Sequence, residues 1–489
     1  MSIGRHTAYN LAGSAIPLLL ALATVPVYIK LVGPDRYGVL AIAWVLLGYF
    51  GMFDLGLGRA TTYQIAALKD GSDEERASVY WSAVIINLGM GIVGGAVLWL
   101  CSHYFFSYLF KVDGALREEV LSSVWLLAFA VPIATLTGVL SGALMGRGQF
   151  LWPNMISVTS TSLFQIFPLM VAWWFGPNLW GLLLAAISAR LVAIVALWLH
   201  CYYAVANRIA PRFDRSKARE LLGYGGWVAL TSLVAPALVM VDRFSIGAVI
   251  GATAVAIYTI PFQLAQRISI VPGALMSALF PRLPSASPEE RDALSIRAIE
   301  TLASALGGPI LVAIFLLHPF LNLWVGPTLG DQAATTGRLL LFGFWINAFA
   351  VVPYSRLQAS GRPDKVVKVY AFEIPVYLAL LYYCMKHFGL AGCGIAMIVR
   401  NIADYCLLSY VASGTIRSSG LLLSYAALLC VGLILAAEAA YHSPVWWSAV
   451  FVTLAAMAVL SWVKLPLELK QLVGKSWTAW TARQPRQAE

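Results

Sequence analysis

The sequence predicts an all-α integral membrane protein with about fourteen transmembrane helices. Long apolar stretches follow one another along its 489 residues, with only short loops between them. Hydrophobic residues make up 60% of the chain and charged residues 11%, and the mean hydropathy is +0.78. Because soluble domains carry roughly 25% charged residues, this composition indicates a chain that lies mostly within a bilayer.

The predicted helices form two groups of six and a final pair, each long enough to cross roughly 30 Å of hydrocarbon. The first six cover residues 8–32, 36–66, 79–110, 119–145, 154–175 and 179–206. The second six cover 221–250, 253–281, 293–322, 331–359, 366–388 and 391–413, and the pair covers 420–442 and 444–465. The first apolar stretch is too long for a cleaved signal peptide, so we expect it to remain as a helix.

Basic residues are concentrated on one side of this topology. If the N-terminus is cytoplasmic, the inside loops and the tail hold eighteen lysines and arginines. The outer connections hold six, namely Lys30, Arg36, Lys111, Arg117, Arg338 and Lys386. This bias predicts that both termini are cytoplasmic and explains most of the net charge of +10. The basic linker at 207–220 is also suited to anionic lipid headgroups.

The chain repeats itself weakly but in order. Four features recur after 219, 218, 215 and 213 residues: Pro17 with Pro236, Gly33 with Gly251, Gly146-Arg147 with Gly361-Arg362, and Phe175-Gly176 with Phe388-Gly389. Two pseudo-symmetric bundles of six helices are therefore expected, as in many transporters. The predicted divisions are an N-terminal lobe at 1–206, the linker at 207–220, a C-terminal lobe at 221–413, and the helix pair with a cytoplasmic tail at 414–489.

The sequence carries no pattern of an enzyme, a metal site or a nucleic-acid-binding domain. Its six cysteines are scattered through apolar stretches, without a C-x-x-C pair or histidines at ligand spacing. A phosphate-binding loop and an H-E-x-x-H motif are both missing from the sequence. We therefore expect no catalysis, no metal, no cofactor and no nucleic-acid partner.

Nine ionisable side chains lie well inside the predicted helices, where each costs about 3 kcal/mol unless it is solvated or paired. The basic ones are Arg59, Arg190, Arg243, Arg267 and Arg400, and the acidic ones are Asp54, Asp242, Glu373 and Asp404. Arg190 and Arg267 lie deepest without an evident partner on their own helix, and they are the best candidates for binding an anion. A guanidinium suits phosphate because its planar fork donates hydrogen bonds in pairs and remains charged.

Some of these charges have a simpler interpretation, which stays open at this point. Arg59 is near the inner end of its helix and can extend its charge to the interface. Arg400 and Asp404 are four residues apart and can neutralise each other. Asp242 and Arg243 are adjacent and point in different directions, so they do not satisfy one another on one helix.

Polar stripes indicate which helices line a pathway. They comprise Asn10, Ser14, Pro17, Thr24 and Tyr28 on the first helix, Tyr224, Thr231 and Asp242 on the seventh, and Gln263, Gln266, Arg267 and Ser277 on the eighth. A polar face toward lipid is costly, so we expect these helices to line a cavity between the halves. For single serines and threonines, hydrogen bonding across packed helices is the better interpretation.

Three runs in each half carry a family resemblance. In the first half they are N-L-A-G-S-A-I-P (10–17), L-V-G-P-D-R-Y-G (31–38) and F-D-L-G-L-G-R-A (53–60). In the second half they are V-D-R-F-S-I-G (241–247), I-G-A-T-A-V-A-I-Y (250–258) and F-P-R-L (280–283). The chain thereby resembles the polysaccharide-transport, Wzx-type branch of the MOP flippase superfamily.

The resemblance implies a transporter that moves an undecaprenyl-pyrophosphate-linked oligosaccharide across a bacterial inner membrane by alternating access. Such a repeat unit would belong to an O-antigen, a capsule or an exopolysaccharide. An ion gradient would supply the energy, which would give Asp54, Asp242, Glu373 or Asp404 a coupling role. Membrane lipids are the implied partners, together with a polysaccharide polymerase and a chain-length regulator as further candidates.

The predicted site combines cations for a diphosphate with polar side chains for sugars. Arg190, Arg243 and Arg267 would hold the diphosphate, with Arg59 and Arg400 as further candidates, and Gln263 and Gln266 would bind sugars. A lipid II flippase and a multidrug or cation antiporter of the MATE type are the alternatives. The surplus of arginines inside the helices argues against a cation exporter. A membrane polymerase or ligase is a further alternative, but it would need a longer outer loop.

Overall fold

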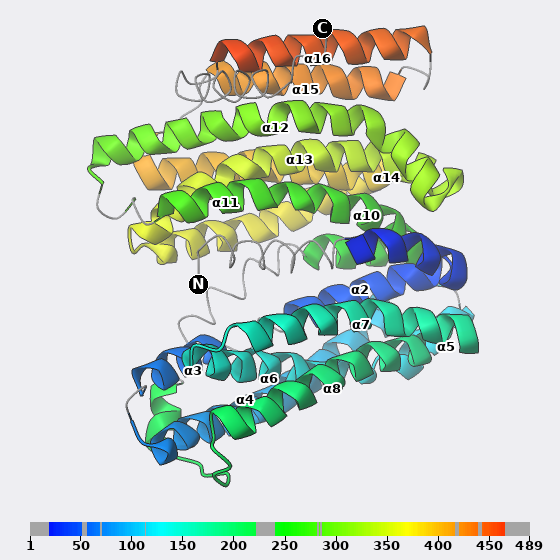
Figure 1. Cartoon of the computed structure of the whole chain (residues 1–489). Coiled ribbons are helices and arrows are strands. Elements are labelled where there is room, and N and C mark those ends of the chain that lie inside the picture. The colour runs from blue at the N-terminus through cyan, green and yellow to red at the C-terminus, as the bar shows by residue number, and fades with distance from the viewer. Residues whose placement is uncertain are drawn as a thin grey trace, which may run out of the picture. The chain divides into compact units, whose positions relative to one another are not determined.

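The computed structural model describes residues 19–50, 56–68, 71–112, 114–221, 240–280, 283, 286–415, 420–438 and 443–464. Every regular element in these ranges is a helix, as the sequence predicts (Figure 1). The chain divides into two compact units, Met1–Ile260 and Pro261–Glu489. The predicted division within the linker at 207–220 stays a prediction.

The first unit begins, in its described part, with the helix Leu19–Val32. The helices that follow are α2 (Pro34–Phe50), α3 (Leu57–Ala67), α4 (Asp73–Tyr104) with the π-helical turn η2 (Phe105–Leu109), α5 (Gly114–Ser123), α6 (Leu126–Gly146), α7 (Leu151–Phe175) and α8 (Leu179–Ala204). Short helices at 215–221 and 240–249 come next, and α10 (Ala252–Ala265) begins in this unit.

The second unit begins at Pro261, within α10, and its described part contains seven further elements. These are the 3₁₀ turn η3 (Gln266–Ser269), α11 (Ile270–Leu279), α12 (Pro288–Val325), α13 (Pro327–Ala359), α14 (Pro363–Ser413), α15 (Gly420–Glu438) and α16 (Pro444–Lys464). Helix α13 packs against α11, α12, α14 and α15, and the pair α15 and α16 packs against α12. The final pair is therefore attached to this unit through α12.

Ten helices of the described residues are long and apolar enough to cross a membrane, and Leu19–Val32 is a shorter apolar helix. The chain is therefore a multi-pass membrane protein, while the predicted number of fourteen spans stays a prediction. Two predicted helices are broken. Gly56 has a φ of 71° immediately before α3, which interrupts the predicted helix at 36–66. A turn at 124–125 separates α5 from α6 within the predicted helix at 119–145.

Matching backbone features mark the internal repeat. Ser72 accepts a hydrogen bond from the backbone N–H of Glu75 at 3.2 Å, and Ser287 accepts one from Glu290 at 3.2 Å. Each serine therefore caps the start of a long helix, α4 or α12, with acidic residues in its first turn. The two caps are 215 residues apart, a separation within the range of the repeat found in the sequence.

Glycines with positive φ recur at the same places in the repeat. Gly33 and Gly251 both have positive φ (83° and 135°), as do Gly176 and Gly389 (87° and 57°). A positive φ is costly for residues that have a Cβ, so glycine is expected at both positions where the repeat has the same turn. Gly389 interrupts α14 and separates two predicted helices that the structure otherwise runs together. In the third pair, Gly361 matches Gly148 rather than Gly146, because Gly146 is still helical.

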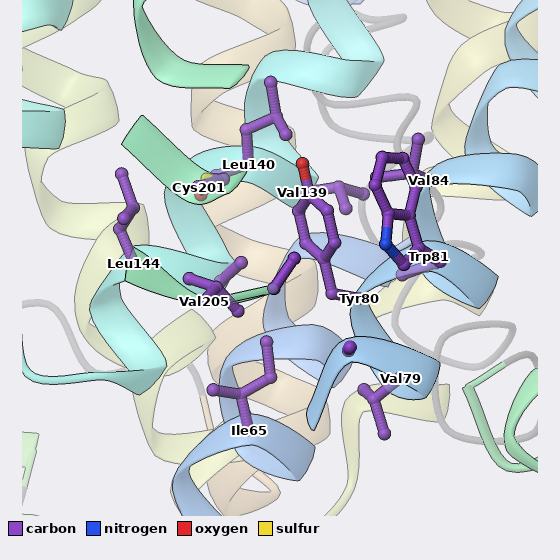
Figure 2. Close-up of a cluster of buried hydrophobic side chains, with 14 of the residues drawn as sticks. Ile65, Val79, Tyr80, Trp81, Val84, Val139, Leu140, Leu144, Cys201 and Val205 are labelled. Carbon is purple, nitrogen blue, oxygen red and sulfur yellow. Dashed lines mark hydrogen bonds between the residues drawn. The ribbon is translucent and has the colours of Figure 1, made fainter. Parts of the chain in front are cut away.

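A core at one end of the first unit joins α3, α4, α6 and α8. Figure 2 shows its side chains converging, with Ile65, Tyr80, Val139, Leu140 and Cys201 among them. Close contact between α3 and α6 depends on glycine: a Cβ at Gly142 would collide with the carbonyl oxygen of Gly58. The hydroxyl of Thr62 lies 3.0 Å from the carbonyl oxygen of Gly142 and 2.9 Å from that of Gly58. Gly142 therefore lets the backbones of the two helices approach closely.

Two adjacent glycines of α12 allow a test of how the final helix pair is held. A Cβ at Gly307 would lie 2.7 Å from the ring of Tyr425 on α15, whereas a Cβ at Gly308 would meet nothing within 4 Å. We expect Gly307→Ala to destabilise the protein by about 1 to 3 kcal/mol through overpacking. Gly308→Ala is expected to be neutral or stabilising by about 0.5 to 1 kcal/mol. The midpoint of thermal unfolding in detergent measures both, and equal midpoints would contradict the packing of Tyr425 on Gly307.

Candidate transport site

In the first unit, Arg190 on α8 lies against an aromatic ring of α7. Its guanidinium carbon is 4.8 Å from the centroid of the Phe164 ring. The side chain is half-buried, and no carboxylate in the described part of the chain lies within ion-pair distance of it. A ring face stabilises a cation by about 0.5 to 2 kcal/mol without neutralising it. The positive charge of Arg190 thus remains available to an anion.

The rings beside Arg190 form a continuous aromatic cluster, which we define as Tyr28, Tyr37, Trp44 and Phe164. The Trp44 ring is 6.3 Å from that of Phe164, 4.9 Å from that of Tyr28 and 5.8 Å from that of Tyr37, measured between centroids. Tyr28 and Tyr37 are fully buried. The cluster gives Arg190 an apolar wall on that side, where hydration is limited and the effective dielectric constant is low.

The predicted polar stripe of the first helix forms packing contacts where it is described. Thr24 donates a hydrogen bond to the side-chain carbonyl of Gln165 at 2.9 Å, and the hydroxyl of Tyr28 donates to the Gln165 backbone carbonyl at 2.7 Å. Both residues are buried. The expectation that Tyr28 lines an open cavity is therefore wrong in this structure, and its polar group is used to join two helices. Asn10, Ser14 and Pro17 lie outside the described residues, as do Tyr224 and Thr231.

Asp242 and Arg243 lie together in the helix at 240–249 and are both buried. The Asp242 carboxylate accepts a hydrogen bond of 2.7 Å from the hydroxyl of Tyr258 on α10. The sequence predicts that these two charges do not satisfy each other, and Tyr258 provides Asp242 with a partner from another helix.

The polar stripe of the eighth predicted helix crosses a change in helix type. Gln263 is on α10, Gln266 and Arg267 are on the 3₁₀ turn η3, and Ser277 is on α11. A 3₁₀ turn has about 3.0 residues per turn, so the expectation of one face on one continuous α-helix is wrong. Gln263 is half-buried, while Gln266 and Arg267 are exposed. These last two side chains are thus accessible to a ligand.

A group of three charges, two buried carboxylates and a half-buried arginine, lies in the second unit on the two parts of α14 that meet at Gly389. Glu373 and Asp404 are 4% and 2% exposed, and a guanidinium nitrogen of Arg400 is 3.9 Å from a carboxylate oxygen of Glu373. Arg400 also lies over the ring of Tyr377, with its guanidinium carbon 5.3 Å from the centroid. The ion pair with Glu373 shows that Arg400 is not simply neutralised by Asp404 along the helix.

This charge group is incompletely satisfied. Neither carboxylate oxygen of Glu373 accepts a hydrogen bond from a described residue, and the same holds for one oxygen of Asp404. Two carboxylates face one guanidinium, so the group carries one surplus negative charge when all three are ionised. A buried surplus charge is expensive, and a bound cation or proton would balance it.

The remaining charges are placed as follows. Arg59 is exposed on α3, and Asp54 lies outside the described residues. Arg338 lies within α13, inside the helix predicted at 331–359; it is 8% exposed and donates a hydrogen bond of 3.2 Å to the carbonyl of Ile314, while its assignment to the outer side stays a prediction. Helix α13 begins earlier than predicted because Pro327 starts it, as proline often does.

Sequence reasoning missed the partners of the candidate residues more than the residues themselves. Phe164 and Gln165 were not singled out, although Gln165 is a lone amide in an apolar stretch. Tyr258 and Tyr377 were also missed, because an aromatic residue in a membrane helix gives no signal of its own. Among the described residues, no three His, Cys, Asp or Glu side chains come together as a metal site.

The fold is that of transporters of the MOP superfamily. The structure resembles an inward-facing multidrug resistance MATE family transporter of that superfamily, with a TM-score of 0.67 and 15% identity over 86% of this chain and 98% of the other. It also resembles the lipid II flippase MurJ in an inward closed conformation, with a TM-score of 0.68 and 12% identity over 96% of this chain and 100% of the other.

The chain belongs to the polysaccharide biosynthesis protein family, whose model matches residues 3–287. A relative from Shigella flexneri is 29% identical over 416 residues, which cover 84% of this chain and 98% of that protein. It is described as a "Putative O-antigen transporter". The protein is therefore a multi-pass membrane protein of the polysaccharide biosynthesis family with the fold of MOP-superfamily transporters.

Proposed function

We propose that this transporter moves an undecaprenyl-pyrophosphate-linked oligosaccharide from the cytoplasmic to the outer leaflet of a bacterial inner membrane. The observation that carries the proposal is Arg190, a half-buried guanidinium with a ring and no described carboxylate as its partner. A site for an organic cation would need the opposite charge. The name of the Shigella flexneri relative supports a saccharide-bearing substrate.

Each part of the substrate has a candidate partner. Arg190, Arg243 and Arg267 are, each considered within its own unit, the candidate cations for the diphosphate, with Arg59 and Arg400 as further candidates. Gln263 and the exposed Gln266 donate and accept hydrogen bonds with sugar hydroxyls. The prenyl chain stays in the bilayer, where its burial needs no protein pocket.

Energy for transport enters, in this proposal, through the charge group of Glu373, Arg400 and Asp404. Its surplus negative charge and its unfilled carboxylate oxygens favour the uptake of a cation, either a proton or a metal ion. Uptake and release of that cation would change the charge inside the second unit by one. Asp242 has a hydrogen-bond donor in Tyr258 and is the weaker candidate.

The substrate is tested by mass spectrometry of prenyl-linked lipids after depletion of the protein, with labelling of the exposed leaflet. We expect an undecaprenyl-pyrophosphate oligosaccharide to accumulate on the cytoplasmic side, which would also place the protein in the inner membrane. Accumulation of lipid II would assign the protein to peptidoglycan synthesis. Unchanged lipids with altered drug sensitivity would support a multidrug transporter and overturn the proposal.

Contacts within the first unit form a candidate outer gate. Helix α2 and the end of η2 meet the segment 244–253, which would lie on the outer side if the N-terminus is cytoplasmic. Thr253 donates a hydrogen bond to Asp35, and a Cβ at Gly38 would collide with the carbonyl oxygen of Ala252. Lys111 donates through its ammonium group to the carbonyl of Val249 at 2.6 Å. In an alternating-access cycle these contacts form and break.

We expect a disulfide between cysteines at positions 35 and 253 to stop transport. The variant Asp35→Cys/Thr253→Cys, made after replacing the native cysteines, would be oxidised, assayed and then reduced. Transport should be lost on oxidation and recover on reduction, because the bond holds the gate closed. The single variant Asp35→Cys is the control, and it should be insensitive to oxidation. Full transport by a demonstrably cross-linked protein would show that these contacts do not open.

A further inference from the structure

The linker that follows α8 is fastened to the first unit along its length. The indole N–H of Trp81 donates to the carbonyl of Ile209 at 2.9 Å, and the backbone N–H of Asp214 donates to the Ser82 hydroxyl at 2.9 Å. At its end, Leu221 is fully buried in the core of Figure 2, beside residues of α3, α4, α6 and α8. The linker thus has a fixed course over the end of this core.

The turn that starts the linker is strained and held in place. Asn207 and Arg208 are the two non-glycine residues with positive φ in the described part of the chain, at 45° and 62°. Such a conformation costs about 1 to 2 kcal/mol per residue and persists only when its surroundings impose it. The side-chain amide of Asn207 donates to the Asp73 carboxylate at 2.7 Å, which fixes the turn to the start of α4.

The acidic residues of the linker are engaged within it. The Asp214 carboxylate accepts hydrogen bonds from the backbone N–H groups of Lys217 and Ser216, and these bonds lower the pKa of Asp214 below its ordinary value. Glu220 forms an ion pair of 3.7 Å with Lys217. Neither carboxylate forms an ion pair with the linker arginines, and both remain charged, so the linker at 207–220 carries a net charge of +3.

Four arginines remain on the outside of the docked linker: Arg208, Arg212, Arg215 and Arg219, all exposed. None of them has a carboxylate within ion-pair distance among the residues that the structure describes. Arg208 lies over the ring of Tyr203, with its guanidinium carbon 5.0 Å from the centroid. Phe213 is 52% exposed between Arg212 and Arg215. Exposed rings among arginines are typical of a surface at the membrane interface.

We propose that this linker patch, defined as Arg208, Arg212, Phe213, Arg215 and Arg219, is a binding surface for anionic phospholipid headgroups of the cytoplasmic leaflet. The arginines bind headgroup phosphates, and Phe213 inserts among the acyl chains near the glycerol level. Charge complementarity selects the lipid, because the patch has four arginines outside any ion pair among the described residues, the linker has a net positive charge, and the leaflet provides anions at its surface. The docked linker holds these cations in one arrangement, unlike a flexible basic segment. The inference is independent of the glycan that is transported.

Native mass spectrometry of the full-length protein measures the patch directly. Binding of a phosphatidylglycerol is compared with that of a phosphatidylcholine with the same chains, at two salt concentrations. We expect Arg212→Gln/Arg215→Gln/Arg219→Gln to reduce phosphatidylglycerol binding at least about tenfold and to leave phosphatidylcholine binding unchanged. The matched control is Arg297→Gln/Arg362→Gln/Lys368→Gln, which removes three exposed cations from the second unit. Unchanged binding by the first variant, or an equal loss in the control, would overturn the proposal.

A second variant tests whether the docked arrangement matters. Trp81→Phe/Ser82→Ala keeps every cation of the linker but removes both tethers. We expect it to bind phosphatidylglycerol more weakly than the native protein does. Equal binding would show that only the net charge of the linker matters, and it would overturn the role of the docked arrangement. Displacement of the lipid by inorganic pyrophosphate, but not by sulfate at equal ionic strength, would assign the patch to a soluble diphosphate and overturn the lipid assignment.

Discussion

Replacing Arg190 with alanine is expected to slow translocation of the lipid-linked oligosaccharide by roughly 10- to 100-fold at a normal level of protein. Hydrogen bonds to charged groups contribute about 1.5 to 3 kcal/mol, and the alanine variant loses both the charge and the paired donors. Arg190→Lys should retain part of the activity, because an ammonium keeps the charge but lacks the planar fork. Flux in proteoliposomes, normalised to folded protein, measures the difference.

Two comparisons separate a binding role for Arg190 from a structural one. Phe164→Leu removes the ring below the guanidinium but leaves the cation, so it should lower transport less than Arg190→Ala does. Arg267, exposed on η3, should behave like Arg190, with loss of transport in the alanine variant and partial activity in the lysine variant. Normal flux through Arg190→Ala at a normal protein level would exclude it from the substrate path.

Replacing Glu373 with glutamine is expected to uncouple transport from the ion gradient without destabilising the protein. The substitution removes the surplus negative charge of the group and leaves Arg400 with Asp404 as its counter-charge. Replacing a member of a buried charge group is harmless when the remaining charges balance. Flux should then no longer respond to an imposed proton or sodium gradient, although exchange across equal concentrations should persist.

Removing the positive charge of this group, instead of a negative one, should destabilise the protein. Arg400→Met leaves two buried carboxylates without a counter-charge, which we expect to destabilise the protein by about 3 to 5 kcal/mol. Asp364→Asn is the control for Glu373→Gln, because Asp364 lies on the same helix but is exposed and paired with Lys368 at 3.6 Å. A gradient response that survives in Glu373→Gln and in Asp404→Asn would exclude this group from coupling.

Much of the fold follows from the sequence, because apolar length and the positions of caps are local properties. The all-helical class was predicted correctly. The break before α3 was not predicted, since the apolar run continues through it and only the backbone of Gly56 marks it. The start of α13 could have been found from Pro327, whose position after Gly326 is a known helix-start signal.

The candidate site was predicted as separate charges rather than as groups. Arg190 was selected for its depth, but the ring of Phe164 comes from another helix, and periodicity along one helix carries no information about its neighbour. Glu373 and Arg400 are brought together across Gly389, which the sequence presents as a gap between two spans. Tyr28 was predicted to line a cavity because it lies on a polar helix face, but its hydroxyl hydrogen-bonds to α7 and joins two helices instead.

The repeated caps and left-handed glycines have an evolutionary consequence. Ser72 and Ser287 cap matching helices of the repeat, and Gly176 and Gly389 have positive φ at matching places, whereas the charged groups of the two units differ. One unit presents an arginine over a ring, and the other encloses two carboxylates around an arginine. In the proposed mechanism, substitutions around Arg190 that adapt the protein to a new glycan would leave Glu373 and Asp404 unchanged, so this part of the substrate site and the coupling group could evolve separately.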